Sequence, residues 1–169
     1  MKPILLLLLL FITGCGPYTN FPAQIRVKSL DPSSAVVSFQ REAVGISVQQ
    51  INNPVLTLQA DPGSIGATYT VARILYSDGA GQRIAILGKE LGVTIRVPPS
   101  TFIDAQGKVV LGVGSSTLPI VNKEVVAFAV GNSGIGALVA DITLEGTDDA
   151  KWPADLTLSV PILFQELKL

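Results

Sequence analysis

Histidine is absent from this 169-residue chain, cysteine occurs once, and charged residues make up only 15% of it. The missing histidine excludes Ser-His-Asp and Cys-His catalysis and every histidine-ligated metal site. Lys and Arg total 12 against 13 for Asp and Glu, so the chain lacks the basic excess expected of a nucleic-acid binder. Because 48% of the residues are hydrophobic, the composition also excludes a disordered chain.

The first residues have the pattern of an export signal. Met1-Lys2 is a short basic start, and an unbroken apolar stretch runs from Ile4 to Ile12. This stretch is too short for a membrane-spanning helix, which needs about 20 residues. A basic start, an apolar segment and small residues at a cleavage site are typical of a secretory signal peptide.

The end of this segment, Ile12-Thr13-Gly14-Cys15, resembles the lipobox of bacterial lipoproteins. The resemblance implies that residues 1–14 are a signal peptide and that the Cys15 sulfur carries a diacylglyceryl group. It also implies a lipid anchor in the bacterial cell envelope, because two or three acyl chains attach a protein stably. Gly16, not Asp, follows the cysteine, which in a Gram-negative cell indicates the outer membrane. The alternative is an ordinary secretory signal with a chance cysteine.

Residues 15–23 form the lipidated cysteine and a short Pro-containing tether, whose eight residues after Cys15 reach at most about 28 Å. No composition shift divides residues 24–169, so we expect a single domain there. No second cysteine is present to form a disulfide, and a packed core must therefore stabilise the fold. The charged fraction of residues 15–169 stays near 15%, so the low charge belongs to the domain.

From Gln24 onward the chain is a series of short runs rich in Val, Ile, Leu and Thr, separated by turn residues. Alternation is clearest in 137–145, where Leu138, Ala140, Ile142 and Leu144 share one face. We therefore predict an all-β fold, an antiparallel β-sandwich of the immunoglobulin or fibronectin kind. The expected strands are 24–30, 35–40, 43–51, 55–60, 67–77, 82–87, 91–97, 108–113, 122–130, 137–145 and 156–167.

Three details refine this prediction. Tyr69 and Tyr76 are seven residues apart in one strand, so strict alternation places them on opposite faces and exposes at least one. Pro161 cannot donate to a strand ladder, which predicts an edge position or a bulge there. The 43–51 segment is also compatible with a helical turn.

Candidate binding residues lie in two loops. Trp152 precedes Pro153 just before the last expected strand, where an exposed indole can stack on a sugar or lie at a membrane interface. The alternative is an indole that covers one end of the core. Asn132 and Ser133 belong to the glycine-rich segment 131–136, which we interpret as an exposed hairpin loop because a strand follows it.

Acidic residues cluster at Glu145, Asp148 and Asp149, with Asp104 or Asp155 as further contributors. Carboxylates are ligands of calcium, so these residues are weak calcium candidates. Their spacing does not match an EF-hand loop, and a solvated turn is the alternative. We predict no metal and no cofactor for this chain.

The chain has no Gly-x-Ser-x-Gly and no Ser-x-x-Lys motif, so we expect no enzyme. Low charge on a domain of this size predicts an apolar or neutral surface that is covered by a partner. We expect a lipid-anchored envelope protein that binds another envelope component or a second copy of itself, and no nucleic acid. The alternatives are a glycan- or small-ligand-binding module and, third, a hydrolase.

Overall fold

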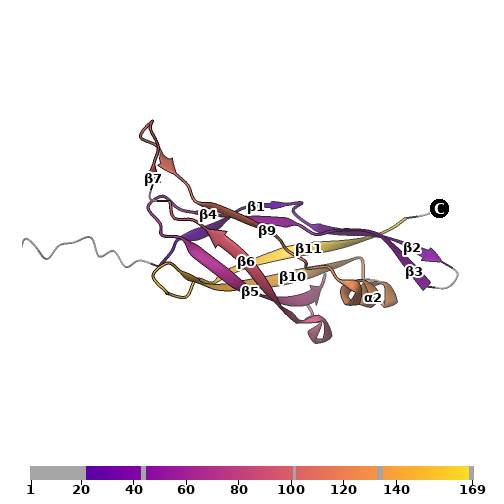
Figure 1. The fold of residues 1–169 in the computed structure, drawn as a ribbon. Coiled ribbons are helices and arrows are strands. Elements are labelled where there is room, and N and C mark those ends of the chain that lie inside the picture. The colour runs from indigo at the N-terminus through magenta and orange to yellow at the C-terminus, as the bar shows by residue number, and fades with distance from the viewer. Residues whose placement is uncertain (1–21, 43–44, 101, 133–134, 168–169) are drawn as a thin grey trace, which may run out of the picture.

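The structure, a computed structural model, describes residues 22–42, 45–100, 102–132 and 135–167. The predicted signal peptide, Cys15 and Ser133 lie outside the described residues. The described chain forms two packed β-sheets, a small hairpin, a 3-10 turn and an α-helix (Figure 1). In chain order the elements are β1 (Ile25–Asp31), β2 (Ala35–Glu42), β3 (Gly45–Asn52), β4 (Val55–Ala60), β5 (Ala67–Asp78), η1 (Ala85–Leu87), β6 (Lys89–Val97), β7 (Phe102–Ile103), β8 (Val109–Val110), β9 (Val113–Thr117), α2 (Lys123–Gly131), β10 (Ala137–Asp148) and β11 (Leu156–Glu166).

The larger sheet has six strands in the order β3-β2-β11-β10-β5-β6, and the smaller has three in the order β1-β4-β9. The predicted all-β class is therefore confirmed. Strand pairing is antiparallel within both sheets except between β2 and β11, which run in parallel from the Ile162–Ala35 pair onward. The prediction of a wholly antiparallel sandwich misses this pair. β11 joins the β3–β2 hairpin to the rest of the sheet.

The core lies between the two sheets. Its residues from β10 are Leu138, Ala140, Ile142 and Leu144, all buried, so the predicted alternation is confirmed. The smaller sheet contributes buried residues from β4 to the same cluster. Burial of a leucine or isoleucine side chain contributes about 1.5–3 kcal/mol, so these facing rows supply the main stabilisation of a domain without a disulfide.

The prediction that Tyr69 or Tyr76 is exposed is wrong, because both side chains are buried. A β-bulge at Thr70 explains the difference. In the β5–β10 register, Val71 pairs with Glu145 and Tyr69 with Gly146, so Thr70 is an extra residue. An extra residue shifts the alternation by one, which turns both tyrosines towards the core.

Pro161 lies in β11, a strand with neighbours on both sides of the sheet, and pairs with Val139 without a register shift. The expected bulge is therefore not found at this residue. The β2 ladder begins only at Ile162, however. The Leu156–Pro161 half of β11 consequently has a partner on the β10 side alone, which is a local edge where a missing N–H is tolerated.

Three predicted strands differ from the observed elements. Segment 122–130 is the helix α2, because Asn122 caps its first turn and its Oδ1 accepts a hydrogen bond from Val125 N at 2.9 Å. Segment 82–87 holds one isolated bridge, Ser77–Arg83, followed by η1. Segment 108–113 divides into β8 and the start of β9, which continues to Thr117.

Two glycines explain how β9 lies against β6. A Cβ on Gly112 would stand 1.7 Å from the Pro98 carbonyl oxygen, and one on Gly114 would stand 2.1 Å from the Arg96 carbonyl oxygen. No side chain fits in these gaps, so only glycine allows the two backbones to approach this closely. The smaller sheet therefore meets the larger one along a seam between β9 and β6.

Candidate functional site

The edge strand β3 presents an apolar face that the smaller sheet does not cover. Ile46, Val48 and Ile51 are each 39–43% exposed. Val48 pairs with Phe39 and Ile51 with Val37, two core residues of β2. Of the two residues between Val48 and Ile51, Gln50 is paired and Gln49 is bulged out of the register. Because cross-strand partners share a face, this bulge turns both Val48 and Ile51 towards the core side of the sheet.

The helix α2 covers part of that core side and forms the second wall of a groove. Val125, Val126, Ala129 and Val130 are buried, whereas Lys123 is exposed. Asn122 caps the helix, and Glu124 lies in its first turn, where a negative charge stabilises the helix dipole. The buried side of the helix thus packs on the core, and its exposed side borders the groove.

A buried tyrosine holds the segment that leads into α2. The Tyr76 hydroxyl, on β5, donates a hydrogen bond to the Ile120 carbonyl oxygen at 2.6 Å. Burial, with a smaller contribution from the charge of Glu124, raises the pKa of Tyr76 to about 12. Asn53 also holds this segment in place, because its Oδ1 accepts a hydrogen bond from Val121 N at 3.0 Å. The helix wall is therefore positioned by contacts to β5 and to the β3–β4 connection.

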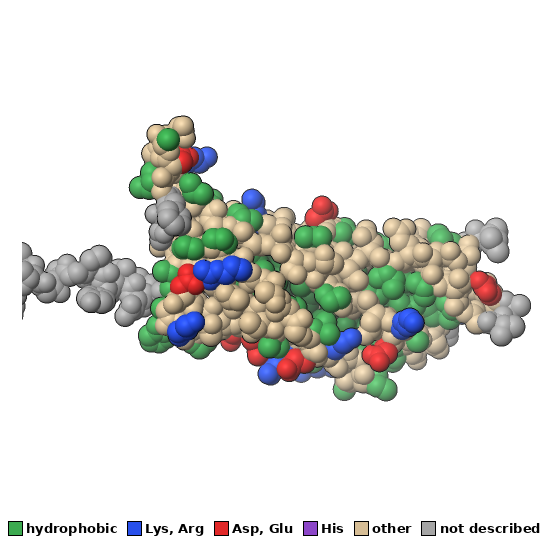
Figure 2. Space-filling model, viewed as in Figure 1, with side chains coloured by type: hydrophobic (Ala, Val, Ile, Leu, Met, Phe, Trp, Pro, Cys, Tyr) green, Lys and Arg blue, Asp and Glu red, His purple; other side chains and the backbone are tan. Residues whose placement is uncertain are grey.

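The groove between β3 and α2 has a volume of about 590 Å³. Figure 2 shows hydrophobic side chains gathered over this end of the molecule, with few charges among them. The lining residues are Ile46, Val48, Gln49, Gln50, Ile51, Lys123, Val126 and Ala127. Lys123 is the charged residue of this lining, and the other lining side chains are apolar or carry a neutral amide. The groove therefore suits an apolar occupant that has polar or acidic groups at its rim.

Asn132, one of the predicted binding residues, is the C-cap of α2, and its side-chain Nδ2 donates to the Phe128 carbonyl oxygen at 2.8 Å. It lines a smaller cavity of about 290 Å³ at the C-terminal end of the helix, near Phe39 and Arg41. The glycine-rich segment joins a helix to a strand, so its prediction as a hairpin loop is wrong. The difference arises because the element before this segment is the helix α2 and not the predicted strand.

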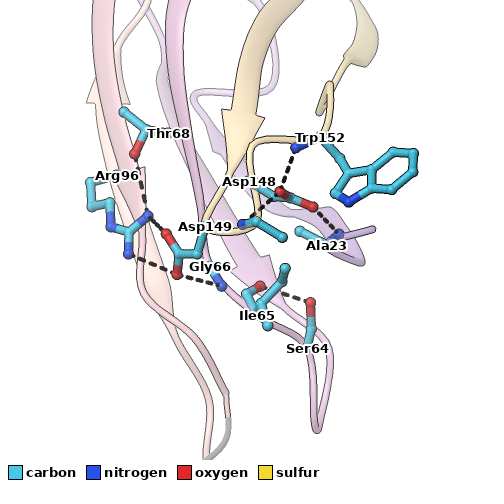
Figure 3. A network of polar contacts seen from close by, with 10 residues as sticks. Ala23, Ser64, Ile65, Gly66, Thr68, Arg96, Asp148, Asp149 and Trp152 are labelled. Carbon is cyan, nitrogen blue, oxygen red and sulfur yellow. Dashed lines mark hydrogen bonds and ion pairs between the residues drawn. The ribbon is translucent and has the colours of Figure 1, made fainter. Parts of the chain in front are cut away.

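Trp152, the other predicted binding residue, is 52% exposed and lies in the β10–β11 loop. Its backbone N–H donates to Asp148 Oδ1 at 2.9 Å, and its ring lies to one side of that carboxylate (Figure 3). Asn132 and Trp152 flank opposite ends of β10, a strand of 12 residues that spans about 40 Å. The structure therefore does not bring the two predicted loops into one site.

The acidic cluster is divided among separate partners. Glu145 pairs with Arg73 at 3.1 Å, and Asp149 pairs with Arg96 at 2.6 Å. The buried Asp148 accepts hydrogen bonds from three backbone N–H groups, including those of Ala23 and Trp152. In the part of the chain that the structure describes, no group of three His, Cys, Asp or Glu side chains comes together as a metal site.

The Arg96–Asp149 pair links the β6 edge to the same loop. Arg96 also donates to Thr68 Oγ1 at 3.3 Å, and Asp149 Oδ2 accepts a hydrogen bond from Gly66 N at 3.1 Å (Figure 3). The hydrogen bond from Arg96 is the main reason that the pKa of Asp149 lies below its ordinary value. Both side chains are well exposed, so the pair contributes at most about 1 kcal/mol.

The groove was missed by sequence reasoning. The one available signal was Asn122-Lys123-Glu124 before an apolar run, which is typical of a helix start. The position of the Gln49 bulge depends on the register with β2 and has no comparable signal.

No family model and no curated protein matches the chain. One solved structure, the X-ray structure of Northeast Structural Genomics Consortium target SoR45, is similar over 84% of this chain and 86% of that chain. The two share 8% sequence identity, with a TM-score of 0.42. Among the described residues, none of the helices has the length and hydropathy needed to cross a bilayer.

Proposed function

We propose that this protein is a lipid-anchored component of the bacterial envelope whose domain binds, without catalysis, an extended apolar segment of another envelope protein. In this proposal residues 1–14 are removed as a signal peptide, Cys15 carries the lipid, and residues 24–169 form a sandwich of the immunoglobulin or fibronectin kind. The two packed sheets and the lipobox-like Ile12–Cys15 support it. In a Gram-negative cell we expect the outer membrane.

The observation that carries the binding role is the apolar core-side face of β3 beside α2. Two features favour an extended peptide as the occupant. β3 is an edge strand with no partner on its outer side among the described residues, so its backbone can pair with an added strand. The row of Ile46, Val48 and Ile51 can receive alternate side chains of that strand. A strand added at this edge covers apolar surface and satisfies free backbone groups together.

The position of the groove also suits a partner in the envelope. α2 and the β2–β3 hairpin lie at the end of the molecule remote from Pro22, where the described chain begins (Figure 1). A protein tethered through Cys15 therefore holds the groove away from its own anchor. Lys123 at the rim favours a partner segment that carries an acidic residue next to its apolar ones.

Photo-cross-linking in intact cells tests this proposal. A photoreactive residue at Val48 should capture one partner protein, and the mapped segment, as a synthetic peptide, should bind and slow amide hydrogen exchange in β3. Leu75 is the matched control, since it is 44% exposed on β5 against 43% for Val48. Ile46→Asp, in the same groove and 42% exposed, should abolish capture from position 48, and Leu75→Asp should not. Equal capture from both positions, or a mapped segment without apolar residues, contradicts the proposal; a cross-link to the same chain indicates self-association.

A further inference from the structure

The end of the molecule opposite the groove carries exposed apolar side chains of its own. Trp152 is 52% exposed, Ile103 69% and Val110 48%. Ile103 and Val110 belong to the hairpin β7–β8, which projects from the body of the sandwich (Figure 1). Ile103 pairs with Val109, whereas Val110 pairs with Phe102, so the two exposed side chains lie on different faces of the hairpin. Both side chains are open to solvent, Ile103 more than Val110.

The base of this hairpin lies beside the point where the chain enters the domain. The buried Ser100 hydroxyl accepts a hydrogen bond from Gly112 N at 2.7 Å and donates one to the Ala60 carbonyl oxygen at 2.9 Å. Ser100 N also donates to the Ser64 carbonyl oxygen at 2.9 Å. The Ser64 hydroxyl in turn accepts a hydrogen bond from Gln24 N at 2.8 Å. A continuous set of hydrogen bonds therefore connects the hairpin base to the first residues of the domain.

Trp152 is tied to the same point. One oxygen of the Asp148 carboxylate accepts hydrogen bonds from Ala150 N and Trp152 N, and the other accepts from Ala23 N at 3.1 Å. Figure 3 shows the indole ring at the side of this cluster, and about half of the residue is exposed. The backbone of Trp152 is thus held in place while its ring is presented outward, next to the residue at which the tether ends.

A lysine lies beside each group of exposed apolar side chains. Lys151 precedes Trp152, and Lys108 lies in the turn of the hairpin, where Asp104 Oδ1 accepts hydrogen bonds from Gln106 N and Lys108 N. Tryptophan and lysine together are typical of the membrane–water interface, where the indole lies at headgroup level. The polar turn favours a hairpin held within the headgroup layer, where both of its faces meet the interface, over one that inserts deeply.

We propose that this end of the domain rests on the lipid bilayer, with Trp152, Ile103 and Val110 at headgroup level and Lys108 and Lys151 beside anionic headgroups. The inference rests on the lipid anchor of the proposed function. A tether of eight residues, about 28 Å at full extension, keeps this end close to the membrane. The anchor makes the contact effectively intramolecular, so weak interfacial binding suffices. The contact orients the long axis of the domain away from the bilayer and presents the β3–α2 groove outward.

The fluorescence of Trp152, the only tryptophan of the chain, reports this contact directly. The lipid-bearing protein is reconstituted into phosphatidylcholine–phosphatidylglycerol vesicles with or without brominated acyl chains, which quench a nearby indole. We expect a blue-shifted emission that is strongly quenched in the brominated vesicles. Ile103→Ser combined with Val110→Ser should reduce the quenching. The control Ile86→Ser should not, because Ile86 is 84% exposed in η1, which follows the other end of β5.

Emission that stays like that of an indole in water, with no effect of bromine, overturns the inference even when the protein is anchored. A blue shift on adding soluble envelope glycans, without quenching by brominated lipid, assigns the face to carbohydrate and also overturns it. Failure of the anchor is recognised separately, because the wild type then fails to float with vesicles, as Cys15→Ala does. In that case the secreted chain is titrated with brominated vesicles up to lipid concentrations at which weak binding is detectable: quenching of Trp152 supports the contact, and its absence overturns it.

Discussion

The carboxylate of Asp148 accepts a hydrogen bond from the backbone N–H of Ala23, 125 positions earlier in the chain, at 3.1 Å. The same buried side chain accepts from Ala150 N and Trp152 N, both at 2.9 Å. One carboxylate therefore fixes both the entry of the chain into the domain and the loop between β10 and β11.

Replacing this carboxylate should be costly. We expect Asp148→Ala to lower the free energy of unfolding by about 2 kcal/mol or more, because each unpaired buried donor costs about 1–3 kcal/mol. Urea denaturation of the purified domain measures the change. Asp155→Ala is the control, since Asp155 is exposed and lies in the same connection. Equal effects of the two substitutions would show that the Asp148 hydrogen bonds are not important for stability.

The close approach of β9 to β6 predicts that alanine substitution at Gly114 destabilises the domain much more than alanine substitution at Gly92. Gly114→Ala places a Cβ 2.1 Å from the Arg96 carbonyl oxygen, so the backbones must separate. We expect a loss of about 1–3 kcal/mol or more in the free energy of unfolding, as for other overpacked sites. Gly92→Ala, in β6, meets nothing within 4 Å and should leave stability unchanged or slightly raised. Thermal unfolding of both variants checks this, and a stable Gly114→Ala contradicts the close approach.

The raised pKa of Tyr76 makes stability depend on alkaline pH. The unfolded phenol ionises near its ordinary value of 10, whereas in the folded domain the pKa is raised to about 12. The stabilisation from the neutral buried form is therefore complete below about pH 10 and lost as the pH rises through about 12. Tyr69, also raised to about 12 by burial, adds to the same loss.

Tyr76→Phe should reduce this alkaline dependence and cost about 1 kcal/mol at neutral pH, because the Ile120 carbonyl oxygen loses its hydrogen bond. Urea unfolding followed across the alkaline range, for the wild type and for Tyr76→Phe, gives both quantities. The Tyr69→Phe variant separates the contribution of the second phenol. An identical pH slope for the wild type and Tyr76→Phe is incompatible with a raised Tyr76 pKa.

Asn122, which caps α2, should affect both the stability of the domain and binding at the proposed groove. Asn122→Ala removes the acceptor for Val125 N and should destabilise the domain by about 1 kcal/mol. It should also lower the yield of partner cross-linking from Val48, because α2 forms one wall of the groove. Asn122→Asp keeps an acceptor and should preserve both properties. Loss of stability with unchanged cross-linking would separate the helix from the binding site.

Local alternation in the sequence predicts those strands that have one face buried along their whole length. In β10 every second residue from Leu138 to Leu144 is buried, so period-two alternation is visible without any partner. A β-bulge breaks this period-two alternation. At Thr70 and Gln49 an extra residue changes which face a side chain occupies, and that choice depends on the register with another strand. The burial of Tyr69 together with Tyr76, and the apolar row on β3, consequently had no local signature.

The candidate site depends still more on tertiary structure. Val125, Val126 and Val130 favour a strand by intrinsic propensity, yet packing across the larger sheet and the Asn122 cap make the segment helical. The exposure of Ile51 follows from the limited extent of the smaller sheet, which no single segment of the sequence reveals. Trp152 was recognised as a candidate because of its residue type, but its exposure and its distance from Asn132 required the assembled fold.

The parallel pairing of β2 with β11 has a consequence for the order in which the protein matures. β2 lies among the first strands and β11 is the last, so the β2–β3 hairpin cannot join its sheet until the C-terminal segment has been made and delivered. Until then β2 exposes an unpaired edge that is prone to association with other chains. Contacts of such long sequence separation form slowly, typically over milliseconds to seconds in β-sandwiches. Completion of the larger sheet therefore waits for synthesis of β11.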